Sequence, residues 1–246
     1  NNLWIGTYGY GLNIYNRKNK QVEIVTTNTS PKKLIDNWVH ALYRDSKGLI
    51  WIGTRQGLNI YSQAAKKFYN IKDYYSFTEE LEFKNNRIYM IIEDSKRNVW
   101  ISTDLGLYRI NWFTEEVKIF AFNTSASGVN TGTNKVFSLL EDDEGFVWIG
   151  TLNGLIKFDP ELNKYFTYKS NIHAKNTISH NTIYSLFQDS EGYIWIGTLS
   201  GLNRFHKTNN EFIYINEKDG LPNNLIYSIQ EDNSGHIWAS TDRGLA

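Results

Sequence analysis

The sequence predicts an all-β protein, a β-propeller built of four-stranded antiparallel blades, and three observations carry this prediction. A tryptophan recurs at intervals of 47, 49, 48, 47 and 43 residues, a period that accommodates four short strands and their turns. Short apolar segments alternate with turn residues at even spacing. One segment of each repeat is apolar throughout, which predicts burial on both faces and favours a propeller over a sandwich. The recurring residues are Trp4, Trp51, Trp100, Trp148, Trp195 and Trp238.

The innermost strand of each repeat is predicted to follow an asparagine that stands fourteen residues before the tryptophan. This segment is apolar, as in residues 181–187, and its fifth position is small in most copies. Small side chains there suit strands that converge on an axis. We interpret the asparagines as structural caps at the start of the strand. They are Asn37, Asn86, Asn134, Asn181 and Asn224.

A tight turn is predicted between the first and second strands, opened by an aspartate and closed by a glycine. Aspartate accepts local hydrogen bonds and glycine adopts a positive φ at little cost. The third copy carries Arg97 in the glycine position, and we expect Asn98 to take the left-handed conformation instead. The aspartates are Asp45, Asp94, Asp142, Asp189 and Asp232.

The second strand carries the tryptophan, followed two positions later by a glycine in several copies. The two residues lie on one face of a strand, so we expect a neighbouring blade to place an aromatic ring over the glycine. All recurring tryptophans are predicted to be core residues. A glycine turn then leads to a third strand, and a polar hairpin leads to a short outer strand. Outer strands are predicted at residues 22–25, 67–69, 117–120, 165–168 and 212–215.

The organisation of the chain is predicted to be a single propeller fragment covering residues 1–246. The first copy begins at its second strand and the last stops as its third begins, so we expect an incomplete ring of about five blades plus a partial blade. Exposed edges of the end blades favour self-association or pairing with missing propeller blades. Repeat cores lie near residues 2–15, 37–61, 86–110, 134–158, 181–205 and 224–246.

Composition excludes several classes of function. The 26 lysines and arginines equal the 26 aspartates and glutamates, so no basic excess is available to hold nucleic acid. The absence of cysteine excludes disulfide scaffolds, thiol catalysis and cysteine-ligated zinc. No apolar run approaches the roughly 20 residues of a membrane span. A membrane is therefore expected as a partner only through regions absent from this chain.

Further residues recur around the tryptophan. One copy reads Gly220-Leu221-Pro222-Asn223-Asn224, followed by Glu231-Asp232 and Ile237-Trp238, and several copies read Trp-Ile-Gly-Thr before Gly-Leu. This pattern resembles the two-component regulator propeller repeat in six places. The resemblance implies the sensor region of a bacterial hybrid two-component histidine kinase, periplasmic and anchored in the inner membrane as a full-length protein. It also implies an oligosaccharide ligand and no enzymatic activity in this segment.

Two sets of loops are expected around one mouth of a propeller channel, namely the turn after the second strand and the link before the inner strand. Aromatic faces together with amide, guanidinium and carboxylate groups suit a sugar, although each residue can equally be a solvated turn residue. The variable links 71–85 and 122–133 are expected to add specificity. The candidate ligand-binding residues are Tyr8, Tyr10, Arg55, Gln56, Asp104, Asn153 and Arg243 from the turns, and Trp38, Arg87 and Lys135 from the strand starts.

Two alternatives stay open beside a sensor. The repeats also resemble those of propeller lyases such as streptogramin lyase, which use a histidine and Mg²⁺, and His173 or His180 is then the candidate base. A protein-binding scaffold is the other alternative. No zinc-type histidine pair, phosphate loop or nucleophile motif occurs, and the acidic run 141–144 lacks the spaced ligands of a calcium loop. We predict no metal site, no cofactor and no catalytic residue in this segment.

Overall fold

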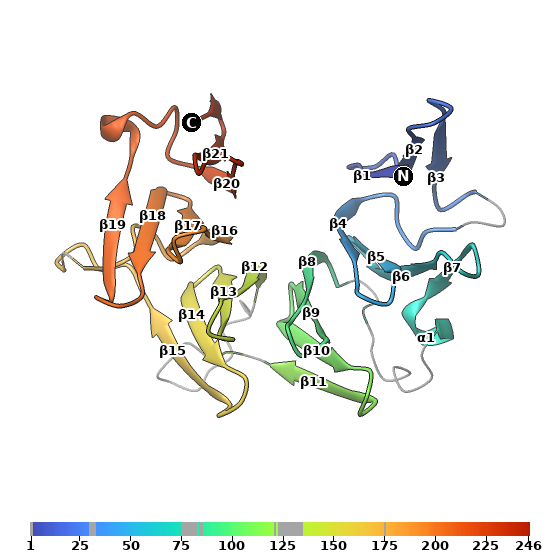
Figure 1. The fold of residues 1–246 in the computed structure, drawn as a ribbon, viewed down its shortest axis with the longest axis horizontal. Helices are drawn as coiled ribbons and strands as arrows, with labels where there is room; N and C mark the ends of the chain where they lie inside the picture. The colour runs from blue at the N-terminus through green and yellow to red at the C-terminus, as the bar shows by residue number, and fades with distance from the viewer. Residues whose placement is uncertain are drawn as a thin grey trace. The chain divides into compact units, whose positions relative to one another are not determined.

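The computed structural model describes residues 2–29, 33–74, 83, 86–120, 122, 135–174 and 176–246. Its strands form six antiparallel sheets, four with four strands and two with three (Figure 1). The chain divides into two compact units, Asn1–Ala121 and Phe122–Ala246, and each is described by itself. Within every sheet the strands pair in chain order, as the blades of a propeller do.

Unit 1 holds three sheets. The first consists of β1 (Asn2–Gly6), β2 (Leu12–Asn16) and β3 (Val22–Val25). The second consists of β4 (Val39–Arg44), β5 (Leu49–Thr54), β6 (Gly57–Ser62) and β7 (Lys67–Asn70), followed by a short helix α1 (Ile71–Tyr74) that the sequence analysis did not anticipate. The third consists of β8 (Ile88–Glu93), β9 (Asn98–Thr103), β10 (Leu107–Asn111) and β11 (Glu116–Phe120).

Unit 2 also holds three sheets. The first consists of β12 (Val136–Glu141), β13 (Val147–Thr151), β14 (Gly154–Asp159) and β15 (Lys164–Tyr168). The second consists of β16 (Ile183–Gln188), β17 (Ile194–Thr198), β18 (Gly201–His206) and β19 (Glu211–Ile215). A 3-10 turn, η2 (Glu217–Asp219), leads to β20 (Ile226–Glu231), β21 (Ile237–Thr241) and β22 (Gly244–Leu245).

The all-β class and the blade architecture are confirmed, but the predicted number of blades was wrong. An incomplete ring of about five blades plus a partial blade was expected, and six sheets are present. The difference arises at the two ends of the chain, where three strands are enough to form a paired sheet: β1–β3 at one end and β20–β22 at the other. Of the links 71–85 and 122–133, expected to carry specificity, residues 75–82, 84–85 and 123–133 lie outside the described residues, as does Asn134.

Neighbouring blades in a unit pack through their inner strands, with β4 beside β8 in unit 1 and β12, β16 and β20 in succession in unit 2. A glycine two positions after the tryptophan, present in four of the six copies, makes room for this packing. A Cβ atom added to Gly53 meets Cγ2 of Ile88 at 2.6 Å, and one added to Gly197 meets Cγ2 of Ile226 at 2.7 Å. The expectation of a ring over the glycine was therefore wrong, because a β-branched aliphatic residue of the next blade takes that place.

The small residue of the inner strand is explained by the same contact. Ala41 pairs with Gly53 and Ser185 pairs with Gly197 in the antiparallel register. The added Cβ atom at Gly197 also lies 2.2 Å from Oγ of Ser185. A large side chain at this position of the inner strand competes for the space that the neighbouring blade fills.

Each turn aspartate links the first and second strands to the tryptophan. In the fourth blade, Oδ1 of Asp142 accepts hydrogen bonds from the backbone N–H groups of Glu144 and Phe146, and Oδ2 accepts the indole N–H of Trp148 at 2.7 Å. The same indole-to-aspartate bond joins Trp51 to Asp45, Trp100 to Asp94, Trp195 to Asp189 and Trp238 to Asp232, at 2.6–2.9 Å.

The turn of the third blade differs from expectation. Arg97 itself takes the positive φ of 69°, as the glycines do at the same position in other blades. Asn98 instead belongs to β9, where its side-chain amide donates to Oδ2 of Asp94 at 2.7 Å. The hydrogen bonds of Asp94 hold the turn, and Arg97 adopts the left-handed conformation without glycine's freedom.

The second strands are buried on both faces in the four complete blades, as predicted, and Trp51, Trp100 and Trp148 are fully buried. The prediction fails in the end sheets. Trp4 is half-buried against the core of its neighbouring blade, and Trp238 is 48% exposed. The sheet β20–β22 has one neighbouring blade within unit 2, so one of its faces lacks that cover.

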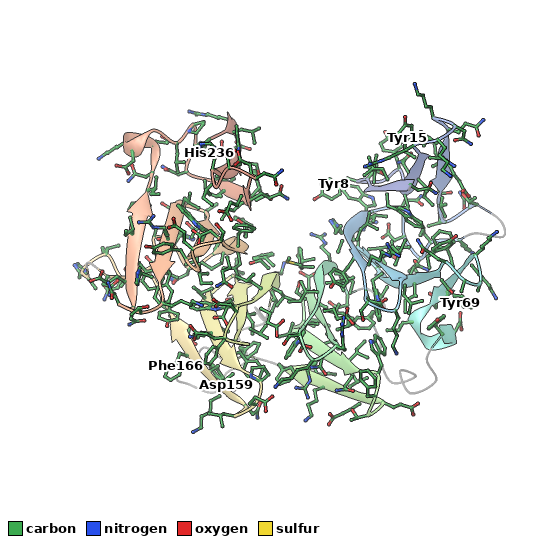
Figure 2. All side chains as sticks on the ribbon, in the orientation of Figure 1. Tyr8, Tyr15, Tyr69, Asp159, Phe166 and His236 are labelled. Atoms are coloured by element: carbon green, nitrogen blue, oxygen red, sulfur yellow. The ribbon has the colours of Figure 1, made fainter. Side chains whose placement is uncertain are left out.

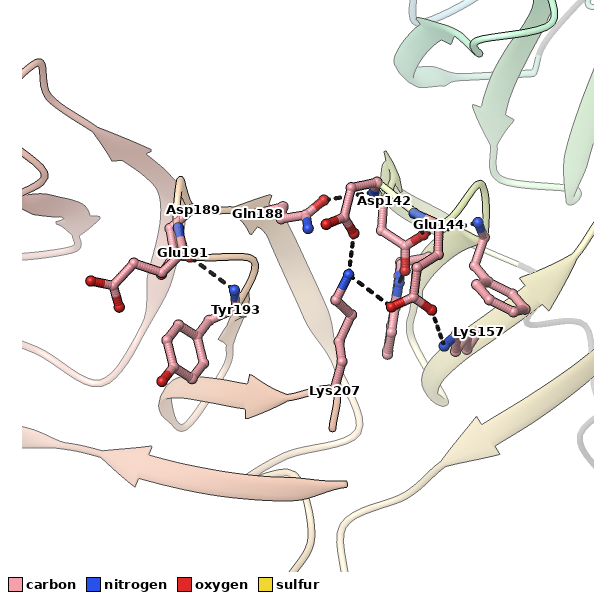
Figure 3. A network of polar contacts seen from close by, with 11 residues as sticks. Asp142, Glu144, Lys157, Gln188, Asp189, Glu191, Tyr193 and Lys207 are labelled. Carbon is pink, nitrogen blue, oxygen red and sulfur yellow. Dashed lines mark hydrogen bonds and ion pairs between the residues drawn. The ribbon is translucent and has the colours of Figure 1, made fainter. Parts of the chain in front are cut away.

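The acidic run of the fourth blade forms a charged hairpin tied to lysines (Figure 3). Asp143 and Glu144 both contact Nζ of Lys207, which comes from the next blade, and Glu144 lies 3.9 Å from Nζ of Lys157. The hydrogen bond from Lys207 lowers the pKa of Asp143. Similar ties recur between blades, since Glu93 accepts two hydrogen bonds from Ser46 and Glu231 accepts two from Ser190.

Candidate functional site

A β-bulge in every inner strand aims one side chain out of the regular sheet pattern. In β4 the register steps from Val39 directly to Ala41, so His40 has no partner on β5. Bulges redirect the side chain of the unpaired residue, and they are common next to functional sites. The bulged residue is a ring-bearing one in each inner strand: His40, Tyr89, Phe137, Tyr184 and Tyr227.

The two loop sets expected on one face do meet. The backbone N–H of Arg55 donates to the carbonyl of Trp38 at 3.0 Å, and that of Asp104 donates to the carbonyl of Arg87 at 3.3 Å. In unit 2, Leu152 makes the same bond to Lys135. The turn after each second strand is thus fixed beside the start of the inner strand of its own blade.

The strand-start asparagines behave as caps. The side chain of Asn37 accepts the backbone N–H of Thr27 at 2.8 Å, and that of Asn181 accepts the backbone N–H of Ser170 at 2.8 Å. The carbonyl of Asn37 also accepts the N–H groups of Gly9 and Gly11 from the preceding blade. These contacts explain Asn37 and Asn181 without a ligand, whereas Oδ1 of Asn86 is buried without a hydrogen-bond partner.

Aromatic rings from three blades meet in unit 1. Tyr8 stacks on Trp38 with centroids 5.8 Å apart and lies 5.0 Å from the ring of His40, which in turn lies 6.4 Å from Tyr89. We call these four residues the aromatic face. Figure 2 places Tyr8 at the inner side of unit 1 and Tyr69 at its outer edge. Tyr8 is 67% exposed and Trp38 is 39% exposed, so both rings are accessible to solvent.

Charged groups border the aromatic face at Trp38. The guanidinium of Arg55 lies over the Trp38 ring at 5.0 Å, and its Nε lies 3.3 Å from Oδ2 of Asp36. Asp36 is 6% exposed and also accepts the backbone N–H of Trp38 at 2.9 Å. The ion pair holds the guanidinium near the indole, so Arg55 places hydrogen-bond donors beside the Trp38 ring.

A second charged group borders the aromatic face at Tyr89. The guanidinium of Arg87 lies 5.8 Å from the Tyr89 ring, and the Tyr89 hydroxyl donates to Oδ1 of Asp104 at 2.7 Å. Burial and then the bond to Asp104 raise the pKa of Tyr89 to about 12, so the hydroxyl remains a donor at physiological pH. Tyr89 is therefore positioned by Asp104 and shielded from ionisation.

The histidine of the aromatic face is shifted toward its neutral form. Burial, and next the charge of Arg87, lower the pKa of His40; Arg55 acts in the same direction, while Asp36 and Asp104 oppose it. When the pH falls, a histidine whose pKa is lowered in the folded protein takes up a proton in the unfolded chain at a higher pH than in the folded protein. Its contribution to stability is therefore lost as the pH falls through about 6.5 toward the folded pKa.

We predict that the substitution His40→Phe flattens the loss of stability between pH 8 and pH 5. Phenylalanine occupies the equivalent bulge at Phe137, so the ring is kept and the titration is removed. Thermal unfolding of both proteins across this pH range measures the difference. His173 is exposed, so His173→Gln serves as the control and should leave the pH profile unchanged. Equal profiles for the wild type and His40→Phe contradict the assignment.

The structure gathers five of the ten predicted residues in unit 1: Tyr8, Trp38, Arg55, Arg87 and Asp104. Tyr10 is 80% exposed and Gln56 is exposed, and neither side chain has a partner among the described residues. His40, Tyr89 and Asp36 were not among the site residues predicted from the sequence. The signal for the first two was present, because a ring stands three residues after the asparagine in each copy.

The remaining predicted residues belong to unit 2. The side chain of Asn153 lies 3.5 Å from Nζ of Lys169, and Lys135 is half-buried. Arg243 is exposed, and its backbone N–H bonds Thr241. The bulge residues of this unit form a row in which Phe137 lies 5.4 Å from Tyr184 and Tyr184 lies 6.1 Å from Tyr227. The Tyr227 hydroxyl approaches Asp242 at 3.5 Å, as Tyr89 approaches Asp104.

The histidines considered for catalysis occupy a link of unit 2. His173 is exposed, and Nδ1 of His180 accepts the backbone N–H of Thr182 at 2.9 Å. Across the described residues, no three histidine or acidic side chains converge as metal ligands. The same part of the chain contains no helix with the length and apolarity that crossing a membrane requires.

The fold and its recurring residues define a β-propeller protein whose blades are copies of one tryptophan-centred repeat. Residues 33–56, 82–104, 132–153, 177–200 and 220–243 match the Two component regulator propeller family. These five segments are accordingly two-component regulator propeller repeats, and the resemblance seen in the sequence is confirmed at five of its six places.

Two relatives share sequence with the chain. Histidine kinase P4 of Formosa agariphila is 32% identical in a match that covers 48% of this chain and 12% of the kinase. The extracellular domain of BT3049 from Bacteroides thetaiotaomicron, described as a hybrid two component system, is 30% identical with a TM-score of 0.79, over 99% of this chain and 31% of that domain. The chain thus spans a small part of either protein.

A second solved structure shares the fold alone. Virginiamycin B lyase of Staphylococcus aureus has a TM-score of 0.69 at 14% identity, over 96% of this chain and 72% of the lyase. Similarity at this level of identity carries no catalytic residue from the lyase to this chain.

Proposed function

We propose that this chain is a ligand-binding propeller segment of the extracytoplasmic sensor of a hybrid two-component histidine kinase, and that its ligand is an oligosaccharide. In the full-length protein the segment lies in the periplasm and an inner-membrane anchor connects it to the kinase. The proposal is supported by the family of the repeats and by the extracellular domain that the chain resembles. Binding acts as a signal if the ligand favours one arrangement of propellers or protomers over another.

The single observation that supports a sugar as the ligand is the aromatic face with its charged border. Pyranose rings present C–H groups that stack on aromatic rings and hydroxyls that need both donors and acceptors. The exposed rings of Tyr8 and Trp38 supply the stacking surface. Arg55 supplies donors beside them, and Asp104 supplies an acceptor.

Isothermal titration of the full ectodomain with an oligosaccharide panel tests the proposal. We expect one glycan class to bind, and Trp38→Ala to weaken that binding by at least about tenfold, or ~1.4 kcal/mol. Phe166 is 72% exposed on the outer strand β15, so Phe166→Ala is the matched control and should bind normally. The melting temperature of each variant confirms folding. Binding of another ligand class, with no heat from any glycan, defeats the proposal.

A further inference from the structure

Two nitrogen atoms beside the aromatic face are buried without a hydrogen-bond partner: Nε2 of His40 and Nε of Arg87. Both residues contact Tyr89, the histidine ring at 6.4 Å and the guanidinium at 5.8 Å. Buried polar groups are nearly always paired, so unpaired ones at a candidate site indicate a missing partner. Both side chains lie near the ring of Tyr89, so one polar group bound beside that ring would serve both atoms.

The charges of the site indicate the chemistry of that group. Arg55 has a counter-ion in Asp36, and Asp104 accepts the Tyr89 hydroxyl. Arg87 is half-buried, and in the described part of the chain no carboxylate lies within ion-pair distance of it. A half-buried guanidinium without a counter-ion carries an electrostatic cost that an anion removes.

We propose that Arg87 and His40 bind an oxyanion of the ligand, so that the site selects an acidic oligosaccharide carrying a carboxylate or a sulfate ester. This inference rests on the proposed function and names its substrate class. The oxyanion accepts the Nε–H of Arg87 and, once His40 is protonated, the Nε2–H of the imidazolium. The sugar ring that bears it lies against Tyr8 and Trp38, which are adjacent to His40.

The same geometry makes binding of the acidic ligand depend on pH. The groups facing His40 are the rings of Tyr8 and Tyr89, the cations Arg55 and Arg87, and the carboxylates Asp36 and Asp104. The two cations oppose protonation of His40 in the free protein, and a bound anion offsets them. The acidic ligand should therefore bind more tightly as the pH falls from 8 to 6, whereas a neutral ligand should bind equally at both values.

The test compares three probes on the full ectodomain by titration calorimetry: an oligosaccharide of uronic acids, its carboxyl-reduced neutral counterpart, and a sulfated neutral oligosaccharide. A charge-assisted contact should favour an acidic probe over the neutral one by about tenfold to a hundredfold. Arg87→Gln should reduce that ratio to about one. Arg17→Gln, in the exposed hairpin between β2 and β3, is the matched control and should preserve it.

The possible results separate the two proposals. Preference for the uronic acid or for the sulfated probe, lost in Arg87→Gln, supports the inference and identifies which oxyanion is bound. Equal binding of neutral and acidic probes, unchanged in Arg87→Gln, overturns the inference that the site binds an oxyanion. The proposal that the ligand is an oligosaccharide is then unaffected. Absence of binding by all glycans, with another ligand class bound, overturns both. The pH dependence of binding distinguishes a direct contact from a loss of folding.

Discussion

Replacing Trp148 with alanine is expected to destabilise unit 2 by about 3–5 kcal/mol, because the indole is fully buried and its loss leaves a large cavity. The ring packs between Tyr168 and Phe205, at 6.0 and 5.4 Å, in the core that joins two blades. Its N–H is also the partner of the buried Asp142 carboxylate. Denaturant unfolding followed by circular dichroism measures the change in the free energy of unfolding.

Trp238→Ala is the control for this experiment. Trp238 is the equivalent tryptophan in another copy of the repeat and makes the equivalent bond to an aspartate. Its side chain, however, is 48% exposed. We expect a clearly smaller loss of stability, because less apolar area returns to water and no closed cavity forms. Equal losses at the two positions contradict the packing described for the complete blades.

Replacing Asp142 with alanine has the second largest expected effect. The carboxylate is 5% exposed and accepts three hydrogen bonds, from Glu144, Phe146 and Trp148. Each buried donor left unpaired costs about 1–3 kcal/mol, and the indole N–H is one of them. We therefore expect a loss of about 3 kcal/mol in the free energy of unfolding, measured by denaturant titration.

The neighbouring Asp143 provides a control in the same turn. Its side chain is 62% exposed and its contact is with Lys207, so Asp143→Ala should cost less than about 1 kcal/mol. A double-mutant cycle that combines Asp142→Ala with Trp148→Phe should show coupling, because the two residues share one hydrogen bond. Additive effects instead show that the turn and the indole act independently.

The blades were predictable because their determinants lie within one repeat. The tryptophan, the aspartate six residues before it and the turn glycine act through contacts inside a single sheet, and their recurrence reveals the period. The side chain that packs over the strand glycine was not predictable in the same way. Ile88 of the next blade fills the space above Gly53, and a repeat pattern does not state which side chain a neighbouring blade presents.

Only some residues of the candidate site could be predicted from the sequence. Tyr8 and Arg55 stand in turns and Trp38 at a strand start, where polar and aromatic side chains are candidates for binding. His40 and Tyr89 stand inside apolar strands, where alternation assigns them to the regular sheet. A ring recurs at this position in each copy, but its recurrence does not show that a bulge redirects the side chain. Asp36 was missed because its role depends on Arg55, nineteen residues later.

The central claim is that one repeat both builds the blades and, through the bulge of its inner strand, supplies the recognition surface of unit 1. Hydrogen–deuterium exchange of the full ectodomain, with and without a saturating acidic oligosaccharide, tests it most directly. The account predicts slowed exchange in peptides that contain Trp38 to Ala41 and Arg87 to Met90, with no change in the outer hairpin 16–21. Slowed exchange confined to the outer strands, with these two segments unaffected, contradicts it.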